Sequence, residues 1–426
     1  MSGVPISAQC VVVGGGPAGI MAGFLLARAG VEVVVLEKHR DFLRDFRGDT
    51  IHPSTLDVIA ELGLLDEFLE RPHQRVQYAE GELGGTRVRI ADFTHLPTRC
   101  KFVAFMPQWE FLNFIAEHAR RLPNFRLMMS TEATGLVHDG GRVAGVSACS
   151  SAGDIDLRAD LVIGADGRRS RLREAAGLAV TDLGAPMDVL WFKLPYDAEQ
   201  HHLVLGRFEA GQAMIMLDRG DYWQCALIIR KGTMEDVMSR GIEAFRARVA
   251  CLTGRERLDE PSSFDDVKLL TVKVDRLEDW SRSGLLFIGD AAHAMSPAGG
   301  VGINLAVQDA VAAANLLAEP LRGGRLSLED LQRVQRRRMF PTRATQALQV
   351  AVQNRVIDPL LRGEETPKLP AILKLMQHWT WLQRLPARII GMGFRPEHVR
   401  SPEVMTLRHE AGAGLTAARA AAEDPD

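Results

Sequence analysis

The chain has 426 residues, which is too long for one ordinary hydrophobic core and predicts two or three domains. Hydrophobic residues make up 46% of it and charged residues 25%, a mix that is typical of a soluble globular protein and excludes a disordered or fibrous one. The formal net charge of −3 argues against nucleic acid as the main partner, and no apolar stretch predicts a transmembrane helix. The five cysteines are scattered without a C-x-x-C pair, so we expect no disulfide framework, no metal site and a cytoplasmic location.

The first predicted unit is a strand, a glycine turn, a helix and a second strand. An apolar run at residues 10–13 precedes the glycines, residues 20–29 have a helical composition, and a β-branched run at 31–36 ends at Glu37. The acid lies 23 residues after the first glycine. This order is typical of the dinucleotide-binding βαβ unit.

Each residue of the glycine turn has a physical reason to be there. Gly14 allows the tight turn, Gly16 lets the backbone approach a pyrophosphate, and Gly19 lets the helix pack on the strand. Pro17 suits a first helical turn, whose free N–H groups favour phosphates, and Glu37 would accept hydrogen bonds from ribose hydroxyls. The motif does not separate FAD from NAD. The predicted contacts of this unit are Gly14, Gly16, Pro17, Ala18, Gly19, Glu37 and Lys38.

The next elements alternate between helices and short strands. A loop at residues 47–53 leads into a helix, for which Ser54 and Asp57 predict a start that resembles a capping box. Residues 76–99 contain three glycines between short extended segments and predict a hairpin of another sheet. Residues 108–122 return to helical spacing.

The second half contains a β-rich segment between two motif-bearing strands. Short strands lead to the turn at residues 159–167, and residues 186–279 have strand-like pieces with no glycine fingerprint. An apolar strand then reaches Asp290 and is followed by a small-residue helix at 301–317. The remainder is mainly helical and basic. We expect the arginines at 333, 336, 337 and 338 to form a solvated helix face and residues 411–426 to be frayed.

Three separated motifs occur in one order: GGGPAG at residues 14–19 with Glu37, LVIGADGRRSRLRE at 161–174, and LLFIGDAAHAMSPAGGVGIN at 285–304. Over about residues 8–345 this order resembles the para-hydroxybenzoate hydroxylase-like, or group A, FAD-dependent monooxygenases. The resemblance implies an α/β fold, in which a Rossmann-like FAD-binding domain of the glutathione-reductase type is interleaved with a β-sheet substrate domain and followed by a helical C-terminal region. We predict residues 1–75, 100–185 and 280–345 as the discontinuous FAD-binding domain, 76–99 and 186–279 as the substrate domain, and 346–426 as the helical region.

The resemblance also implies roles for single residues. Asp290 would hydrogen-bond a ribityl hydroxyl of FAD, and Asp166 with Gly167 would lie near the pyrophosphate, in a motif associated with both FAD and NAD(P)H. Arg47 matches an arginine that contacts the pyrophosphate, and Gln108 matches a glutamine that opens the later helix. The loop against the isoalloxazine ring would comprise Pro297, Gly300, Gly302, Ile303 and Asn304. The N-terminus of the helix that follows would favour the negative charge of the reduced flavin.

The function implied is that of an FAD-dependent monooxygenase, a hydroxylase. It would use NADH or NADPH and O2 to insert one oxygen atom into a small organic, aromatic or polyketide-like substrate by way of a flavin C4a-hydroperoxide. NAD(P)H would bind transiently, since the chain has no second glycine fingerprint. An FAD-dependent dehydrogenase or reductase remains an alternative, as does a non-enzymatic chaperone of the GDP-dissociation-inhibitor type. A halogenase is disfavoured because the W-x-W-x-I-P motif is absent.

No residue can be assigned as the base that activates the substrate. His52 is a candidate that would face the flavin or the substrate, although a local hydrogen-bonding role is more common for a lone histidine. Tyr222 and Trp223 are candidates to line the substrate cavity, with core packing as the alternative, and His293 is expected to be packed or capping. The apolar segment 370–394 would form a lid or pack in the core more readily than contact a membrane. A monomer and a homodimer are both compatible with the sequence.

Overall fold

The computed structural model of the chain describes residues 6–43, 50–196, 206–363 and 371–405, with the backbone alone at 371–373. Its largest sheet has eight strands, in the order β19-β20-β11-β1-β2-β8, and β10 and β9 extend it from β11. The strands are β1 (Ile6–Val13), β2 (Val33–Leu36), β8 (Phe125–Met128), β9 (Thr131–Asp139), β10 (Arg142–Ser150), β11 (Gly153–Gly164), β19 (Ser281–Arg282) and β20 (Leu285–Phe287). The five from β20 to β8 are parallel, so their carboxyl ends share one edge of the sheet.

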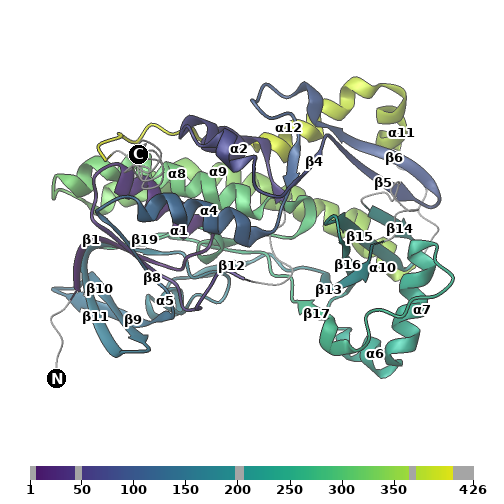
Figure 1. The fold of residues 1–426 in the computed structure, drawn as a ribbon, viewed down its shortest axis with the longest axis horizontal. Coiled ribbons are helices and arrows are strands. Elements are labelled where there is room, and N and C mark those ends of the chain that lie inside the picture. The colour runs from purple at the N-terminus through teal and green to yellow at the C-terminus, as the bar shows by residue number, and fades with distance from the viewer. Residues whose placement is uncertain (1–5, 44–49, 197–205, 364–370, 406–426) are drawn as a thin grey trace, which may run out of the picture.

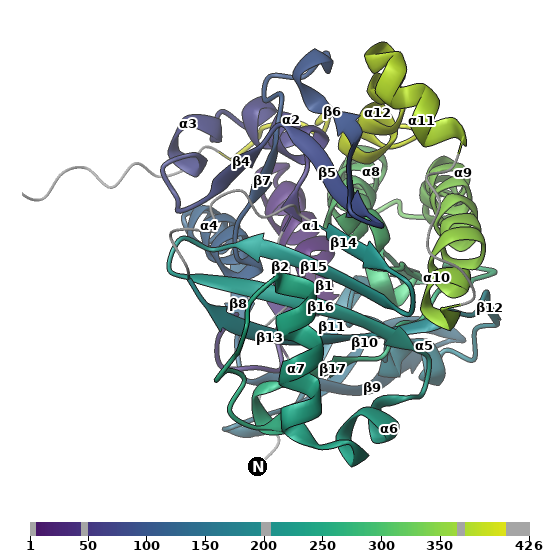
Figure 2. The same cartoon turned by 90° about the vertical axis from the view of Figure 1, so that its right-hand side faces the viewer.

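Three helices pack together beside this sheet. They are α1 (Pro17–Arg28), α4 (Gln108–Arg120) and α8 (Gly302–Arg322). Helix α1 contacts both of the others (Figure 1), and Figure 2 shows it between α4 and α8. By length and composition the stretch Ala298–Arg322 could cross a membrane, but 83% of its most apolar window is buried inside the protein, as in a core helix. The parallel strands and the packed helices give the α/β architecture that the sequence predicted.

A second sheet joins two separate parts of the chain. Its seven strands run in the order β17-β13-β16-β15-β14-β5-β6. They are β5 (Tyr78–Leu83), β6 (Thr86–Asp92), β13 (Met187–Pro195), β14 (Gly206–Glu209), β15 (Gln212–Asp218), β16 (Tyr222–Arg230) and β17 (Lys268–Leu270). The β5–β6 hairpin is attached by parallel pairing of β5 with β14. Helices α6 (Met234–Ser239) and α7 (Gly241–Thr253) cover one face, with Phe245 of α7 against Phe192 of β13 (Figure 2).

Smaller elements connect the two sheets. One three-stranded sheet contains β3 (Thr50–Ile51), β4 (Gln74–Val76) and β7 (Val103–Phe105), and another contains β12 (Val180–Asp182), β18 (Asp275–Leu277) and β21 (His293–Ala294). The short helices among them are α2 (Pro53–Glu61), α3 (Leu65–Phe68) and α5 (Arg171–Ala175). These elements surround the carboxyl edge of the large sheet, where the sequence motifs lie.

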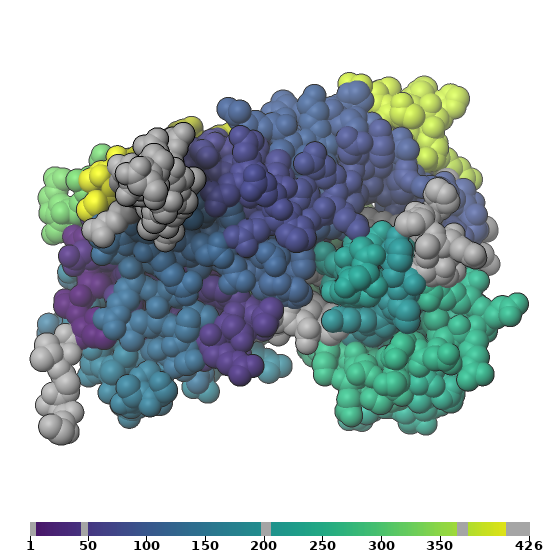
Figure 3. All heavy atoms as spheres, viewed as in Figure 1, coloured from purple at the N-terminus to yellow at the C-terminus, as the bar shows by residue number. Residues whose placement is uncertain are grey.

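The C-terminal region is helical, as the sequence predicted. It contains α9 (Leu328–Val352), a π-helical turn (Gln353–Ile357), α10 (Asp358–Arg362), α11 (Ala371–His378) and α12 (Arg384–Met392). The predicted boundary at residue 345 falls inside α9. Of the segment predicted as a lid or core piece, Ala387 and Gly391 are buried, whereas Trp381 and Leu385 are 61% and 64% exposed. Figure 3 shows this yellow part projecting at the upper right, above the green lobe formed by the second sheet and its helices.

The predicted capping box at the start of α2 is wrong. His52 is the residue that precedes the helix, and Pro53 takes the first helical position. Ser54 instead donates its hydroxyl to Asn304 Oδ1 at 2.6 Å, and Asp57 Oδ1 accepts the N–H of Arg99 at 2.9 Å. Tertiary partners therefore replace the local cap. The predicted frayed tail lies outside the described residues.

Candidate functional site

The three sequence motifs follow adjacent strands of the large sheet. In the strand register Val13 lies opposite both Leu36 and Gly164, and Gly164 lies opposite Phe287. Because these strands are parallel, the glycine turn, Glu37 and the two Asp-containing turns meet at one edge. Segments about 270 residues apart in the chain thus form one site.

The glycine turn has two glycines that the fold requires and one that leaves room for a ligand. A Cβ at Gly14, where φ is +106°, would lie 2.3 Å from Ala165 O, and a Cβ at Gly19 would lie 1.9 Å from Gly14 O. A Cβ at Gly16 would meet no described atom within 4 Å. Gly16 precedes α1 without a side-chain cap, so the first N–H groups of this helix are suited to an anion. This open cradle fits a pyrophosphate.

Glu37 is held against the glycine turn. It is 8% exposed, and its two carboxylate oxygens accept the N–H groups of Gly15 and His39, each at 3.0 Å. These bonds orient the carboxylate as an acceptor for a ribose hydroxyl. Ala18 serves packing, because a Cβ at Gly289 would lie 2.8 Å from the Ala18 Cβ. Lys38 is exposed beside this group.

The Asp166 turn and the Asp290 turn are joined by an ion pair. Arg168 Nε donates to Asp290 Oδ2 at 3.0 Å across 122 residues of sequence. Asp166 Oδ2 accepts the N–H of Leu172 at 3.3 Å, whereas its Oδ1 is buried without a partner among the described residues. Burial raises the pKa of Asp166, against the hydrogen bonds that it accepts. Gly167 has φ +83°, which favours glycine at this turn.

A buried charged cluster supports the turn that carries Asp290. Asp309 Oδ2 accepts the N–H of Gly289 at 3.0 Å and contacts His293 Nε2 at 2.6 Å, and its Oδ1 accepts from Arg338 Nε at 2.9 Å. Burial alone would raise the pKa of Asp309, but His293 and Arg338 outweigh it and hold the pKa below its usual range. The predicted solvated arginine face is therefore wrong for Arg338, which is fully buried as the partner of Asp309.

The loop before α8 presents a second open cradle. Gly300 has φ +64°, and a Cβ there would lie 2.5 Å from Thr50 Oγ1, which donates to Gly300 O at 2.9 Å. A Cβ at Gly302 would meet no described atom within 4 Å. Helix α8 begins here without a side-chain cap or an acidic residue in its first turn, so its N-terminal amides, Ile303 included, present positive potential. This arrangement fits the electron-rich edge of a flavin ring.

Asn304 is clamped by α2. Its Oδ1 accepts the hydroxyls of Ser54 at 2.6 Å and Thr55 at 2.9 Å, and the residue is 1% exposed. Ser54 also donates to Gly391 O of α12 at 3.1 Å. The start of α8 is thereby fixed to both α2 and the C-terminal region.

His52 links the same loop to α12. Its Nε2 lies 3.0 Å from Gly300 O and its Nδ1 lies 2.8 Å from Ile390 O, and the residue is 1% exposed. Burial lowers the pKa of His52 to about 4, against these two backbone bonds. The ring is then neutral at pH 7, so it has one N–H and donates to one of the two carbonyls at a time. Each ring nitrogen therefore lies within hydrogen-bond distance of a backbone carbonyl oxygen.

The other predicted site residues are more scattered. Gln108 opens α4 after Pro107, and no hydrogen bond of its side chain is found in the described part of the chain. Tyr222 begins β16, where the Lys193 ammonium lies 4.7 Å from its ring centre. Trp223 is buried on the α7 side of the sheet. Pro297 directly precedes the turn Ala298–Gly300. Arg47 lies outside the described residues.

An apolar cluster lies where the second sheet meets the elements beside the motifs. It combines residues of β6, β7, β15 and α12, with Trp191 of β13 packed against it. Its buried members are Ala91, Phe93, Leu96, Val103, Phe105, Leu217 and Ala387. An apolar cluster of this kind can bind an apolar ring and exclude water. The sequence does not reveal this cluster, because its buried members come from four separate segments of the chain.

Asp309 and Arg168 were also missed. Asp309 had a usable signal, because it is the only acid in residues 302–318 of an apolar helix and a buried carboxylate is costly without a partner. Arg168 stands in the second motif beside Asp166 and Gly167, but its ion pair could not be predicted, since its partner Asp290 is 122 residues away.

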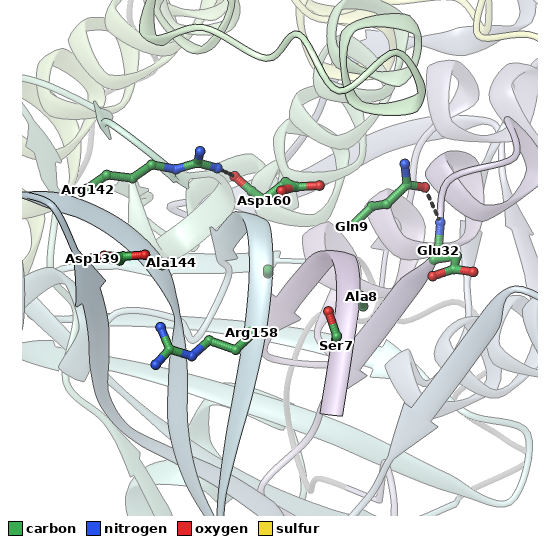
Figure 4. Close-up of a pocket in the computed structure, with 10 residues that line it drawn as sticks. Ser7, Ala8, Gln9, Glu32, Asp139, Arg142, Ala144, Arg158 and Asp160 are labelled. Carbon is green, nitrogen blue, oxygen red and sulfur yellow. Dashed lines mark hydrogen bonds between the residues drawn. The ribbon is translucent and has the colours of Figure 1, made fainter. Parts of the chain in front are cut away.

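An open depression of about 370 Å³ lies away from these motifs (Figure 4). It is lined by Ser7, Ala8, Gln9, Glu32, Asp139, Arg142, Ala144, Arg158, Ala159 and Asp160. These residues include the start of β1, whereas the glycine turn follows its end, roughly 20 Å away at 3.3 Å per residue. The depression is therefore separate from the candidate site.

Comparisons with known proteins agree with this geometry. Residues 7–347 match a family model described as an FAD binding domain. The chain is 34% identical over 397 residues to a 6-methylpretetramide 4-monooxygenase of Streptomyces rimosus, covering 92% of this chain and 93% of the relative. It is 30% identical to a rifampicin monooxygenase of Streptomyces venezuelae, covering 70% of this chain and 62% of that protein. Among solved structures, an anhydrotetracycline hydroxylase from Streptomyces rimosus has a TM-score of 0.72 at 23% identity, covering 91% of this chain and 76% of that one.

Proposed function

The chain belongs to the group A family of FAD-dependent monooxygenases, and we propose that it uses NADH or NADPH and O2 to hydroxylate an aromatic, polyketide-like substrate. The observation that carries this proposal is the 34% identity to the 6-methylpretetramide enzyme over 92% of the chain. A match of that length includes the second sheet and the C-terminal helices as well as the flavin motifs. The comparisons lend no support to a dehydrogenase or a chaperone of the GDP-dissociation-inhibitor type.

Two helix N-termini would hold the cofactor. The start of α1 at Gly16 would bind the pyrophosphate and Glu37 the ribose, with Asp166, Gly167 and Asp290 lying between the two cradles. The start of α8 would place positive potential beside the ring. FAD supplies the electron transfer and the oxygen activation when it is bound. The proposed contacts are Gly14, Gly16, Pro17, Ala18, Gly19, Glu37, Lys38, Arg47, Gln108, Asp166, Gly167, Asp290, Pro297, Gly300, Gly302, Ile303 and Asn304.

The apolar cluster would position the substrate. We propose that a fused aromatic ring system packs beside Phe105 of β7 and Leu217 of β15, two side chains that are buried in this cluster. Trp191 lies at the margin of this cluster, and we propose Tyr222 as a polar group farther along the sheet. The division into a flavin domain and a substrate domain, a cytoplasmic location and a monomer or homodimer are likewise proposals.

The test is a panel of fused-ring aromatic compounds, assayed for substrate-dependent oxidation of NADH and NADPH. We expect a product heavier by about 16 mass units, because one oxygen atom is inserted. With ¹⁸O2 the product should carry the label. Reduction of the substrate that continues without oxygen would contradict the proposal, and so would label that enters only from water.

A further inference from the structure

Arg168 lies between the two Asp-containing turns. Its Nε donates to Asp290 Oδ2 at 3.0 Å, and its carbonyl oxygen accepts from Arg173 Nη2 at 3.0 Å. Arg173 is itself buried, with its Nη1 3.4 Å from Asp275 Oδ1. Arg173 thus fixes the backbone at Arg168, and the Arg168 side chain binds Asp290.

One nitrogen of this guanidinium has no hydrogen-bond partner among the residues that the structure describes. Arg168 Nη1 is buried, although the side chain as a whole is 30% exposed, and no acceptor for it is found among the described residues. An arginine stays charged, and a buried charged donor without an acceptor is costly. In the same turn, no donor to the buried Asp166 Oδ1 is found in the described part of the chain. A donor and an acceptor that are both left unpaired in one turn indicate that the turn binds a polar ligand.

The position of the turn identifies that ligand. A Cβ at Gly14 would lie 2.3 Å from Ala165 O and 3.0 Å from Asp166 Cα, so the Asp166 turn packs directly on the glycine turn. The open cradle at Gly16 follows in the same turn. A cation here would also reduce the repulsion between the Asp290 carboxylate and a nearby pyrophosphate.

We propose that Arg168 is an FAD-binding residue, which holds Asp290 through Nε and an oxygen of the cofactor pyrophosphate through Nη1. The proposal rests on the proposed placement of the pyrophosphate at α1 and of Asp290 between the two cradles. It adds a phosphate contact from the Asp166 turn to the contacts made by the N-terminus of α1.

The test measures binding of FAD and of riboflavin, which lacks phosphate, to the full-length chain freed of flavin. Arg168→Gln removes the charge, and Arg168→Lys keeps the charge but loses the fork of two donors. Arg171→Gln is the matched control, because Arg171 begins α5 three residues after Arg168, is 61% exposed and pairs with Glu132 of β9. Flavin fluorescence titrations at several salt concentrations give the dissociation constants.

Arg168→Gln should raise the dissociation constant of FAD about ten- to a hundredfold, the loss expected for a charge-assisted hydrogen bond. It should raise that of riboflavin much less, because riboflavin shares only the contact with Asp290. Its FAD affinity should also depend less on salt. Arg168→Lys should lie in between, and Arg171→Gln should match the wild type. Unchanged FAD affinity in Arg168→Gln would overturn the proposal. An equal loss for riboflavin and FAD would also overturn it, because Arg168 would then act only by positioning Asp290.

If Arg168→Gln folds poorly, the dissociation constants of FAD and riboflavin are compared in Arg168→Lys instead. Where riboflavin binds too weakly to measure, the salt dependence decides, since a lost phosphate contact lowers it and a lost structural contact does not. Binding is measured without turnover, so a negative result here is distinct from a failure of the proposed hydroxylation.

Discussion

The buried imidazole of His52 should make the stability of the protein depend on pH. Its pKa is lowered by burial to about 4, whereas an unfolded chain has a value near 6.5. Between these values the unfolded state binds the extra proton, so stability is complete above about pH 6.5 and is lost as the pH falls toward 4. The difference between the two pKa values corresponds to a limit of about 3 kcal/mol, and to about 2 kcal/mol between pH 8 and pH 5.

The measurement is urea unfolding of the wild type and of His52→Gln at pH 8 and pH 5, with FAD in constant excess. A glutamine amide can donate to Gly300 O or Ile390 O but does not titrate in this range. The wild type should therefore lose about 2 kcal/mol more than His52→Gln on acidification. His138→Gln, at an exposed histidine of β9, should behave as the wild type does.

An equal loss in the wild type and His52→Gln would refute this reasoning. It would mean that the two carbonyl oxygens hold a doubly protonated ring at both pH values, because an imidazolium donates to both. The geometry alone permits that state, and the burial of the ring disfavours it.

Two further predictions concern the residues around the motifs. Arg338→Met should lower the free energy of unfolding by about 3–5 kcal/mol, because it leaves the Asp309 carboxylate buried without the arginine that pairs with it. Urea titration measures this loss, and a value below about 1 kcal/mol would contradict the buried pair. Arg336→Met, at an exposed site, is the control. Gly16→Ala should fold normally but bind FAD more weakly, since its Cβ fills only the open cradle, whereas Gly19→Ala should fail to fold because its Cβ would lie 1.9 Å from Gly14 O. Gel filtration and flavin titration separate the two, and a Gly16→Ala protein with normal FAD affinity would contradict the cradle.

The sequence was sufficient for features that depend on neighbours in the chain. The βαβ unit, the hairpin at Gly84 and the strand before Asp290 follow from local turns and from runs of β-branched residues. The resemblance to one flavin site also predicted that the three motifs meet, and in the structure parallel strands bring them to one edge.

Contacts between segments that are distant in the chain could not be predicted from the sequence. Arg338 stands in a basic run that looks solvated, and only the position of α8 shows that Asp309 faces it. In the same way Ser54 looks like a helix cap, but Asn304 lies within 2.6 Å of its hydroxyl. Local pattern and tertiary partner disagree at such residues, and the tertiary partner decides.

The order of strands in the large sheet has a consequence for how the protein is made. The glycine turn leaves the ribosome early, but β20 and the start of α8 follow only after residue 284. At about 5–20 residues per second, roughly 15 to 60 seconds separate the two halves of the cofactor site. Once β11 is complete at Gly164, it has an unpaired edge until β20 begins at Leu285. Cofactor uptake is therefore a late step of biogenesis, and the yield of folded protein in cells should rise with both chaperone and riboflavin supply.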